Sequence, residues 1–294
     1  MTNPTNILVG TIFLLVVAGI LFVTLNQEVE PEIIVVPEPV IEPITPTTTV
    51  STIGTSVNGR LIESHVIGSG ETNLLFVGGI HGGYEWNSIL LAYEIIDYFD
   101  ENPDLIPEKI SMHIIPNLNP DGLFIATGLE GRFESSDITS NEMHTTGEGR
   151  FNANDVDLNR NFDCRWAPES TWRSRTVSGG TAPFSEPEAV AIFDYVATIN
   201  PTAAIVWHSR ANNVYGSECG DAVTIETLNL MSTYARAADY GEVPVFDAYV
   251  VTGAVEDWLA SLSIPTISVE LETRTSSEFG RNLAGTKAVF ESYR

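Results

Sequence analysis

The segment Leu74-Leu75-Phe76-Val77-Gly78-Gly79 decides the fold that this sequence predicts. Four consecutive apolar residues followed by two glycines are typical of a short strand that is buried on both faces of a sheet. Three similar runs occur later in the chain, at 112–116, 203–207 and 266–269. Segments with helical spacing of apolar residues accompany them, at 88–99, 186–199, 224–240 and 282–293. Strands that alternate with helices predict an α/β domain with a mixed, largely parallel central sheet flanked by helices.

The N-terminal segment 1–25 predicts a membrane anchor. Residues 7–25 carry no charge, and a helix of that length, rising about 1.5 Å per residue, crosses a hydrocarbon core of roughly 30 Å. Residues 1–6 contain no Lys or Arg and no Ala-x-Ala sequence follows the apolar stretch, so a retained anchor is favoured over a cleaved signal peptide. We therefore expect a membrane-anchored protein whose globular domain lies outside the cytoplasm, with a secreted protein as the alternative.

Residues 26–50 predict a linker. Proline and glutamate are interleaved through this stretch. Proline removes backbone donors and like charges repel one another, so the chain is expected to be extended there. The pattern becomes globular from about residue 51, which predicts one domain over residues 51–294.

The composition is strongly acidic. The chain has 14 Lys and Arg residues against 39 Asp and Glu residues, which gives a formal charge of −25. Such a surface repels polyanions, so we expect no nucleic-acid partner. We also expect the protein to be a monomer. The two cysteines, Cys164 and Cys219, either pair in an oxidising compartment or remain separate buried thiols, and the sequence leaves both open.

Polar residues occur at the carboxyl ends of the predicted strands. His81 and Glu85 follow the first strand, His208 follows the third, and Glu270 follows the fourth. The carboxyl ends of parallel strands border one crevice of an open α/β sheet. Two histidines and a carboxylate would leave an open position on a catalytic zinc ion, beside which a second carboxylate can act as a base. Taken singly, each residue has a structural alternative: a hydrogen-bonded core histidine, a first-turn helix glutamate, or a glutamate paired with arginine.

Six short motifs resemble, in the same order, those of the carboxypeptidase A/B family of zinc metallopeptidases. They are Gly79-Ile80-His81 with Glu85-Trp86, Asn119-Pro120-Asp121-Gly122, Val156-Asp157-Leu158-Asn159-Arg160-Asn161-Phe162, Phe184-Ser185-Glu186-Pro187-Glu188, His208-Ser209 and Val269-Glu270-Leu271. They extend over about residues 55–294, and residues 1–50 lie outside the resemblance. The resemblance implies the zinc carboxypeptidase fold, one Zn²⁺ per chain, and hydrolysis of the C-terminal peptide bond of peptides or proteins.

The resemblance implies that His81, Glu85 and His208 bind the metal. Asp157 matches the carboxylate that orients the first histidine, which fixes its tautomer and raises its basicity. Glu270 matches the general base, which takes a proton from the attacking water and passes it to the leaving amine.

The resemblance also implies residues that contact the substrate. Asn159 and Arg160 match the pair that holds the terminal carboxylate, for which a planar guanidinium is well suited. Arg150 matches the arginine that stabilises the developing oxyanion. Tyr249, nine residues before Trp258, matches the mobile tyrosine that closes over the bound C-terminus.

The first motif departs from the family pattern. Three residues, Gly82, Gly83 and Tyr84, separate His81 from Glu85, where the family has two. Glycine permits a positive φ and a tight detour, so we still expect Glu85 to reach the metal. Tyr84 also takes the place of an arginine that binds substrate in the family.

Glu256 stands two residues before Trp258, at the position that lies at the bottom of the family's side-chain pocket. An acid there predicts a preference for basic C-terminal residues. The alternative is that Glu256 points away from the pocket and caps a helix together with Asp257.

Other activities remain open beside the carboxypeptidase activity. They are hydrolysis of peptidoglycan stem peptides, hydrolysis of small acyl-amino acids as in the related desuccinylase group, and zinc binding without catalysis. Glu270 argues against the last, because a structural zinc site needs no base.

Overall fold

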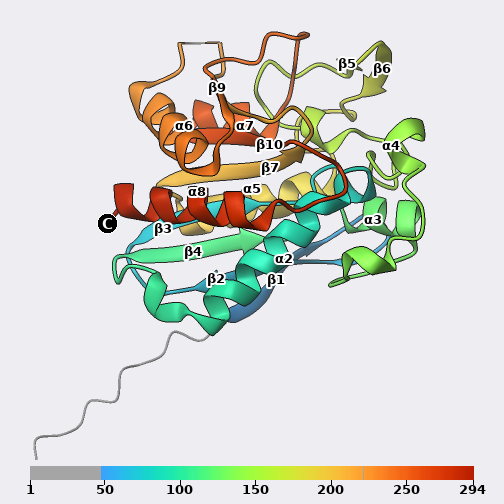
Figure 1. The fold of residues 1–294 in the computed structure, drawn as a ribbon. Coiled ribbons are helices and arrows are strands. Elements are labelled where there is room, and N and C mark those ends of the chain that lie inside the picture. The colour runs from blue at the N-terminus through green and yellow to red at the C-terminus, as the bar shows by residue number, and fades with distance from the viewer. Residues whose placement is uncertain (1–47, 221) are drawn as a thin grey trace, which may run out of the picture. The chain divides into compact units, whose positions relative to one another are not determined.

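The computed structural model describes residues 48–220 and 222–294, which contain a mixed eight-stranded sheet with helices on both faces (Figure 1). The strand order is β1-β2-β4-β3-β7-β10-β8-β9, and the central strands β4, β3, β7 and β10 run parallel. The flanking strands β2 and β8 pair antiparallel with them. The predicted mixed α/β sheet with a largely parallel centre is therefore confirmed.

The sheet strands are β1 (Thr49–Thr55), β2 (Leu61–Ile67), β3 (Thr72–Val77), β4 (Ile110–Ile115), β7 (Ala203–Ser209), β8 (Asn213–Gly216), β9 (Gly241–Val243) and β10 (Thr266–Leu271). A separate hairpin consists of β5 (Glu169–Trp172) and β6 (Arg175–Ser178). The α-helices are α2 (Trp86–Glu101), α3 (Pro120–Thr127), α4 (Met143–Thr146), α5 (Pro187–Ile199), α6 (Ile225–Ala238), α7 (Val255–Ser261) and α8 (Phe279–Ser292). Short 3₁₀ helices are η1 (Gly82–Glu85), η2 (Pro103–Leu105), η3 (Ser135–Asp137) and η4 (Leu158–Arg160).

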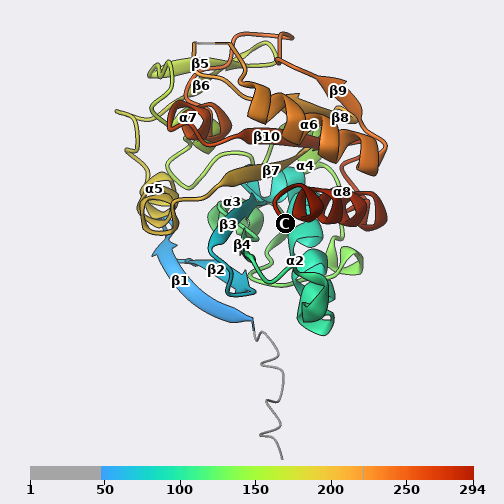
Figure 2. The same cartoon turned by 90° about the vertical axis from the view of Figure 1, so that its left-hand side faces the viewer.

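The two faces of the sheet bury separate hydrophobic cores (Figure 2). Side chains alternate along a strand, so Leu74 and Phe76 of β3 belong to the core with α2, α6 and α8, while Leu75 and Val77 belong to the core with α5 and α7. Burial on both sides explains why the central strands are continuous apolar runs in the sequence.

The register of β7 and β10 brings two polar residues together at the carboxyl edge of the sheet. The two strands are parallel, and His208 lies opposite Glu270. Trp207 and Val269 both belong to the core with α2, α6 and α8. Because neighbouring side chains alternate, His208 and Glu270 both point to the other face, on which α7 lies.

All four predicted strands and all four predicted helices are present, with ends displaced by a few residues. The flanking strands β1, β2, β8 and β9 were not predicted. β1 and β9 are mostly exposed, and β8 and β9 are only four and three residues long, so their sequences carry little apolar signal.

The predicted N-terminal anchor, residues 1–25, lies outside the described residues. The predicted linker, residues 26–50, also lies outside them except for its last three residues. β1 begins at Thr49, so the folded domain starts two residues inside the predicted linker. In the part of the chain that the structure describes, no helix has the length and apolarity needed to cross a bilayer.

Candidate active site

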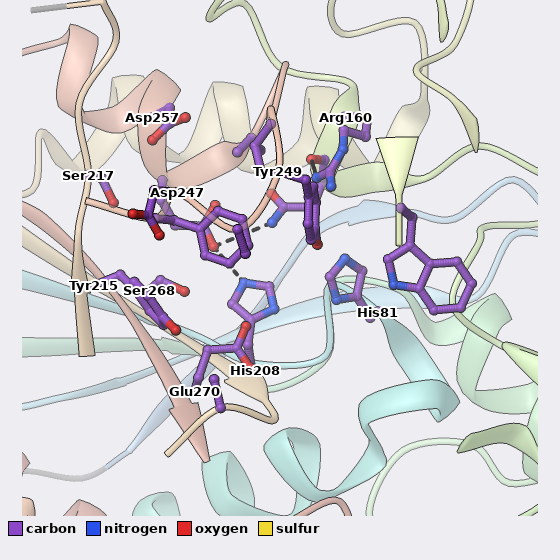
Figure 3. A pocket seen from close by; sticks show the side chains of 18 of the residues that line it. His81, Arg160, His208, Tyr215, Ser217, Asp247, Tyr249, Asp257, Ser268 and Glu270 are labelled. Carbon is purple, nitrogen blue, oxygen red and sulfur yellow. Dashed lines mark hydrogen bonds and ion pairs between the residues drawn. The ribbon is translucent and has the colours of Figure 1, made fainter. Parts of the chain in front are cut away.

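A pocket of about 840 Å³ lies at the carboxyl edge of the central strands (Figure 3). All but one of the predicted site residues line it: His81, Glu85, Arg150, Asn159, Arg160, His208, Tyr249, Glu256 and Glu270. The exception is Asp157, which is fully buried behind His81. Residues predicted from distant parts of the sequence are thus brought to one cavity.

The three predicted metal ligands converge at the floor of this pocket. Glu85 Oε2 lies 3.0 Å from Nδ1 of His81 and 3.1 Å from Nδ1 of His208. The ligand atoms of the three side chains all lie within 4.8 Å of one another. All three residues are buried, so the surrounding packing restricts how far their side chains can move apart.

Gly82 accommodates the extra residue between His81 and Glu85. Its φ is +44°, a conformation that side-chain-bearing residues rarely adopt. A Cβ at Gly82 would lie 2.7 Å from the carbonyl oxygen of Gly149 and 2.8 Å from backbone atoms of Gly122. The extra residue is therefore accommodated by a close approach of the backbone at Gly82 to the backbones of Gly122 and Gly149.

The chemistry of these side chains fits a zinc ion. Two imidazole nitrogens and one carboxylate oxygen are typical zinc ligands, and they leave one coordination position open. Both ring nitrogens of His81 are buried without a hydrogen-bond partner in the described structure. Burial opposes ionisation of Glu85, but His81 and His208 hold its pKa well below the usual range. A carboxylate that stays charged beside two imidazoles suits a cation.

Each predicted ligand histidine faces a second carboxylate with its other nitrogen. His81 Nε2 lies 3.5 Å from Asp157 Oδ1, and His208 Nε2 lies 2.5 Å from Glu256 Oε1. Such carboxylates fix the ring orientation and the tautomer of a metal-binding histidine. Burial opposes protonation of His208, but Glu256 and then Glu85 hold its pKa well above the usual value. This site therefore stabilises positive charge, as a proton or as a metal ion.

Asp157 connects His81 with the predicted oxyanion arginine. Arg150 donates to Asp157 Oδ2 through Nε and Nη2, at 3.0 and 2.8 Å. Although burial opposes ionisation of Asp157, Arg150 and Arg160 hold its pKa far below the usual value. Arg150 Nη1 reaches to 4.0 Å from Glu85 Oε1, so the guanidinium lies beside the metal ligands.

Glu270 lies next to His208 (Figure 3) and has no hydrogen-bonded partner among the described side chains. Burial, and after it the charge of Glu85, raises the pKa of Glu270 to about 7. A carboxylate with a pKa near neutrality can both accept and return a proton, as a general base in hydrolysis must.

Arg160 and Asn159 lie in η4 at the wall of the pocket. Arg160 is buried and donates to the carbonyl oxygens of Asn159 and Thr171, at 2.6 and 3.2 Å, while its Nε has no partner in the described structure. The side chain of Asn159 accepts from the amide of Val255 at 2.9 Å and donates to Glu256 at 3.4 Å. Arg160 thus retains an unused donor, whereas Asn159 holds the start of α7.

Glu256 does not lie open at the bottom of the pocket. Only 5% of its surface is exposed, and its Oε1 accepts from both His208 and Asn159. The predicted contact with a basic side chain would have to compete with these two bonds.

Tyr249 belongs to the loop between β9 and α7, and it lines the pocket as predicted. Its ring meets Phe246 edge-to-face, with ring centres 4.9 Å apart. Figure 3 shows Tyr249 and Arg160 directed into the same cavity.

Sequence reasoning missed one wall of the pocket. Trp172 ends β5 and Arg173 lies in the turn that follows it, Arg210 directly follows β7, and Arg274 follows β10. These residues lie in no motif of the family resemblance. The only sequence signal was that Arg210 and Arg274 come shortly after the ends of the two predicted strands that carry His208 and Glu270.

Cys164 and Cys219 form a disulfide, which decides the pairing that the sequence left open. Next to them, Arg165 lies 2.9 Å from both Glu218 and Asp257. The disulfide therefore ties together two segments of the pocket rim that are 55 residues apart in sequence.

The fold and the His-Glu-His site are those of a metal-dependent hydrolase. A family model described as zinc carboxypeptidase matches residues 44–285, so the chain belongs to the zinc carboxypeptidase family of metallopeptidases.

Two sequence relatives illustrate the range of this family. Gamma-D-glutamyl-L-diamino acid endopeptidase 1 of Lysinibacillus sphaericus is 24% identical over 76% of this chain and 60% of its own length. Mast cell carboxypeptidase A of Mus musculus is 26% identical over 77% of this chain and 58% of its own length. The chain thus spans about 60% of the length of these relatives.

Solved structures show the same fold. Murein-tripeptide amidase from Escherichia coli O157 superposes with a TM-score of 0.58 at 23% identity, over 82% of this chain and 90% of the amidase. Thrombin activatable fibrinolysis inhibitor superposes with a TM-score of 0.65 at 19% identity, over 84% of this chain and 69% of that structure.

Proposed function

We propose that this chain is a zinc-dependent metallocarboxypeptidase that removes the C-terminal residue of peptides or proteins. The observation that carries the proposal is the convergence of His81, Glu85 and His208 beside Glu270, in the pocket that also contains the buried guanidinium of Arg160. A hydrolytic site and a carboxylate receptor in one cavity are what an exopeptidase needs.

The residues of the pocket have complementary roles in the proposed reaction. A zinc ion held by His81, Glu85 and His208 supplies a Lewis acid and lowers the pKa of water. Glu270 accepts a proton from the attacking water and donates it to the leaving amine. Arg150, fixed by two hydrogen bonds to Asp157, stabilises the negative charge that develops on the scissile carbonyl oxygen.

Arg160 binds the terminal carboxylate in this proposal. Its Nε is a buried donor without a partner in the described structure, and a substrate carboxylate would satisfy it. Asn159, the other predicted carboxylate ligand, supports the site by holding Glu256 and the first amide of α7. Tyr249 is proposed to close over the bound C-terminus.

A Glu270→Gln variant tests the enzymatic part of the proposal. We expect turnover to be lost while stoichiometric zinc, measured by metal analysis, stays bound, because Glu270 is not among the ligands. Chelator treatment of the wild type should abolish peptide release, and added zinc should restore it. A Glu270→Gln protein with near-normal turnover would remove this residue from the mechanism.

An Arg160→Ala variant tests the exopeptidase part. Loss of a buried charged partner should lower kcat/KM at least about 30-fold on peptides with a free C-terminal carboxylate. Peptides with an amidated C-terminus should be affected little. Arg175→Ala is the control, because Arg175, in β6, also has no carboxylate within 4.0 Å in the described structure but does not line the pocket. Equal losses on both kinds of peptide would refute carboxylate recognition.

Hydrolysis of peptidoglycan stem peptides is a second candidate function. It is favoured by the similarity to an enzyme named as a gamma-D-glutamyl-L-diamino acid endopeptidase and to one named as a murein-tripeptide amidase. Hippuryl-Arg, hippuryl-Phe, a murein tripeptide and an N-succinyl amino acid should be compared with the same zinc-loaded protein. Preference for the tripeptide would select the peptidoglycan function, and preference for the succinyl substrate would select the desuccinylase-like one. Zinc binding without turnover of any substrate would indicate a pseudoenzyme.

Glu256 has a different role in this proposal from the one predicted from the sequence. Because its oxygen is bonded to His208 and Asn159, we assign it to orienting His208, as Asp157 orients His81. The proposed function therefore does not include a preference for a basic C-terminal residue.

We also propose that the catalytic domain acts outside the cytoplasm, anchored by residues 1–25 or secreted. The disulfide between Cys164 and Cys219 supports this location, because disulfides persist mainly in oxidising compartments. Protease treatment of intact cells should degrade the domain if it is exposed. A domain that is cleaved only after cell lysis would contradict the proposal.

A further inference from the structure

The arginines of this acidic chain are distributed unevenly. Only two of the 14 basic residues are lysines, and eight of the twelve arginines lie within 4.0 Å of a carboxylate oxygen. In the described part of the chain, the arginines without such a neighbour are Arg160, Arg173, Arg175 and Arg210. Three of these four line the active-site pocket. Because acids greatly outnumber bases in this chain, arginines left without acids in the pocket point to an anion supplied from outside.

Two aromatic rings, those of Tyr84 and Trp172, hold Arg173 and Arg274 in place. Tyr84 and Trp172 pack edge-to-face with ring centres 5.2 Å apart. Arg173 donates to the hydroxyl of Tyr84 at 2.8 Å and lies 5.1 Å from the ring centre of Trp172, while Arg274 lies over Tyr84 at 4.1 Å. A cation–π contact holds a guanidinium in place without neutralising its charge or occupying its donors.

Arg210 completes this group, which we call the Tyr84 arginine cluster (Arg173, Arg210 and Arg274). All three residues line the pocket. Burial, followed by the charges of Arg274 and Arg210, lowers the pKa of His144 to about 4, and the His144 ring packs against Tyr84 at 6.3 Å. Arg173 and Arg274 therefore contact Tyr84, the residue that immediately precedes the predicted metal ligand Glu85, and Arg210 acts on His144, whose ring packs against Tyr84.

In the part of the chain that the structure describes, the only carboxylate within 4.0 Å of the cluster is already in use. Arg274 Nη1 lies 3.8 Å from Glu85 Oε1, but Glu85 Oε2 faces both ligand histidines. Arg173 and Arg210 have no carboxylate within 4.0 Å in the part of the chain that the structure describes. Because Glu85 is shared with the two ligand histidines, the cluster keeps a net positive charge.

We propose that the Tyr84 arginine cluster is a second anion-binding subsite, which takes the carboxylate side chain of the residue preceding the scissile bond. The inference rests on the proposed function, in which Arg160 holds the terminal carboxylate. The three arginines of the cluster line the same pocket as Arg160 and the predicted metal ligands, so a peptide held by Arg160 at the metal site can place its preceding side chain at the cluster. The substrate class is therefore peptides with a penultimate acidic residue.

Two N-acylated dipeptides that differ only in penultimate Glu or Gln test this subsite. For the wild type we expect kcat/KM to favour Glu about 10-fold or more, as charge-assisted hydrogen bonds to two guanidinium groups allow. The preference should shrink as salt is added. Arg173→Gln and Arg210→Gln should each lower turnover of the Glu peptide severalfold more than turnover of the Gln peptide. Arg175→Gln, which alters an arginine near Trp172 outside the pocket, should change neither.

Binding of the same two peptides to the zinc-free protein, measured by calorimetry, separates this inference from the proposed function. Tighter binding of the Glu peptide, weakened by Arg173→Gln or Arg210→Gln, without turnover after zinc is restored, would support the subsite and refute the carboxypeptidase. Turnover of both peptides at equal kcat/KM would refute the subsite and leave the carboxypeptidase standing. Equal or undetectable binding together with no turnover would refute both.

Discussion

Two buried histidines of the same sheet show how partners decide what a histidine can do. His208, at the end of β7, contacts the carboxylates of Glu85 and Glu256. His113, in β4, contacts only neutral groups: its Nδ1 lies 2.7 Å from the hydroxyl of Tyr195 and its Nε2 lies 3.0 Å from Asn73 Oδ1. Both rings are more than nine-tenths buried, so burial alone does not distinguish them.

The hydrogen bonds of His113 fix its neutral form. Asn73 donates to the carbonyl of Ile199, so its oxygen accepts from Nε2–H of His113. Ser64 donates to Tyr195, whose hydroxyl can then donate to Nδ1 of His113. Burial lowers the pKa of His113 to about 4, whereas carboxylates raise that of His208. One network excludes positive charge and the other requires it, so only the second can hold a metal.

Replacing the two histidines should have opposite consequences, and this is the largest effect we expect. His208→Ala should lose stoichiometric zinc and lower kcat/KM on the order of 10³-fold, since metal catalysis contributes several kcal/mol. His113→Ala should retain zinc and near-normal activity but unfold at lower urea concentration, because Asn73 and Tyr195 lose a buried partner. Metal analysis and urea titration of both variants provide the measurement. Full zinc occupancy in His208→Ala would contradict the comparison.

The carboxylates of Asp157 and Glu256, which face the predicted ligand histidines, should contribute less to zinc binding than the ligands themselves. Asp157→Asn and Glu256→Gln should each weaken zinc affinity about 10- to 100-fold, as is common for groups that orient a histidine ligand. Competition with a chromogenic chelator measures this without any substrate. If Glu256 served substrate recognition instead, Glu256→Gln would leave zinc affinity unchanged and alter only the choice of C-terminal residue.

The hydrogen bonds that keep His113 neutral should make the stability of the fold depend on pH. The pKa of His113 is about 4 in the folded protein, below its unfolded value, so the unfolded chain binds more protons at intermediate pH. The stabilising contribution is complete above pH 6.5 or so and is lost as the pH falls towards 4. Between pH 7.5 and 5 the free energy of unfolding should drop by about 2 kcal/mol from this group. His113→Gln should flatten that part of the curve, and an unchanged slope would show that His113 titrates normally.

The sequence predicted the site better at strand ends than in loops. His208 and Glu270 could be placed from the apolar runs that precede them, because the ends of parallel strands share one edge. Trp172 and Arg173 could not, since their positions depend on a hairpin whose sequence has no regular apolar period. Glu256 lines the pocket, but its bond to His208 depends on how α7 docks, which no local pattern encodes.

The contact of Gly82 with Gly122 and Gly149 has a consequence for engineering. Gly149 immediately precedes Arg150, so the segment that carries the predicted ligands His81 and Glu85 and the segment that carries the predicted oxyanion arginine touch through backbone alone. A chimera that imported the shorter His-x-x-Glu turn of other family members would leave Gly122 and Gly149 facing an emptied gap. We expect successful grafts to require transplanting all three segments as one module.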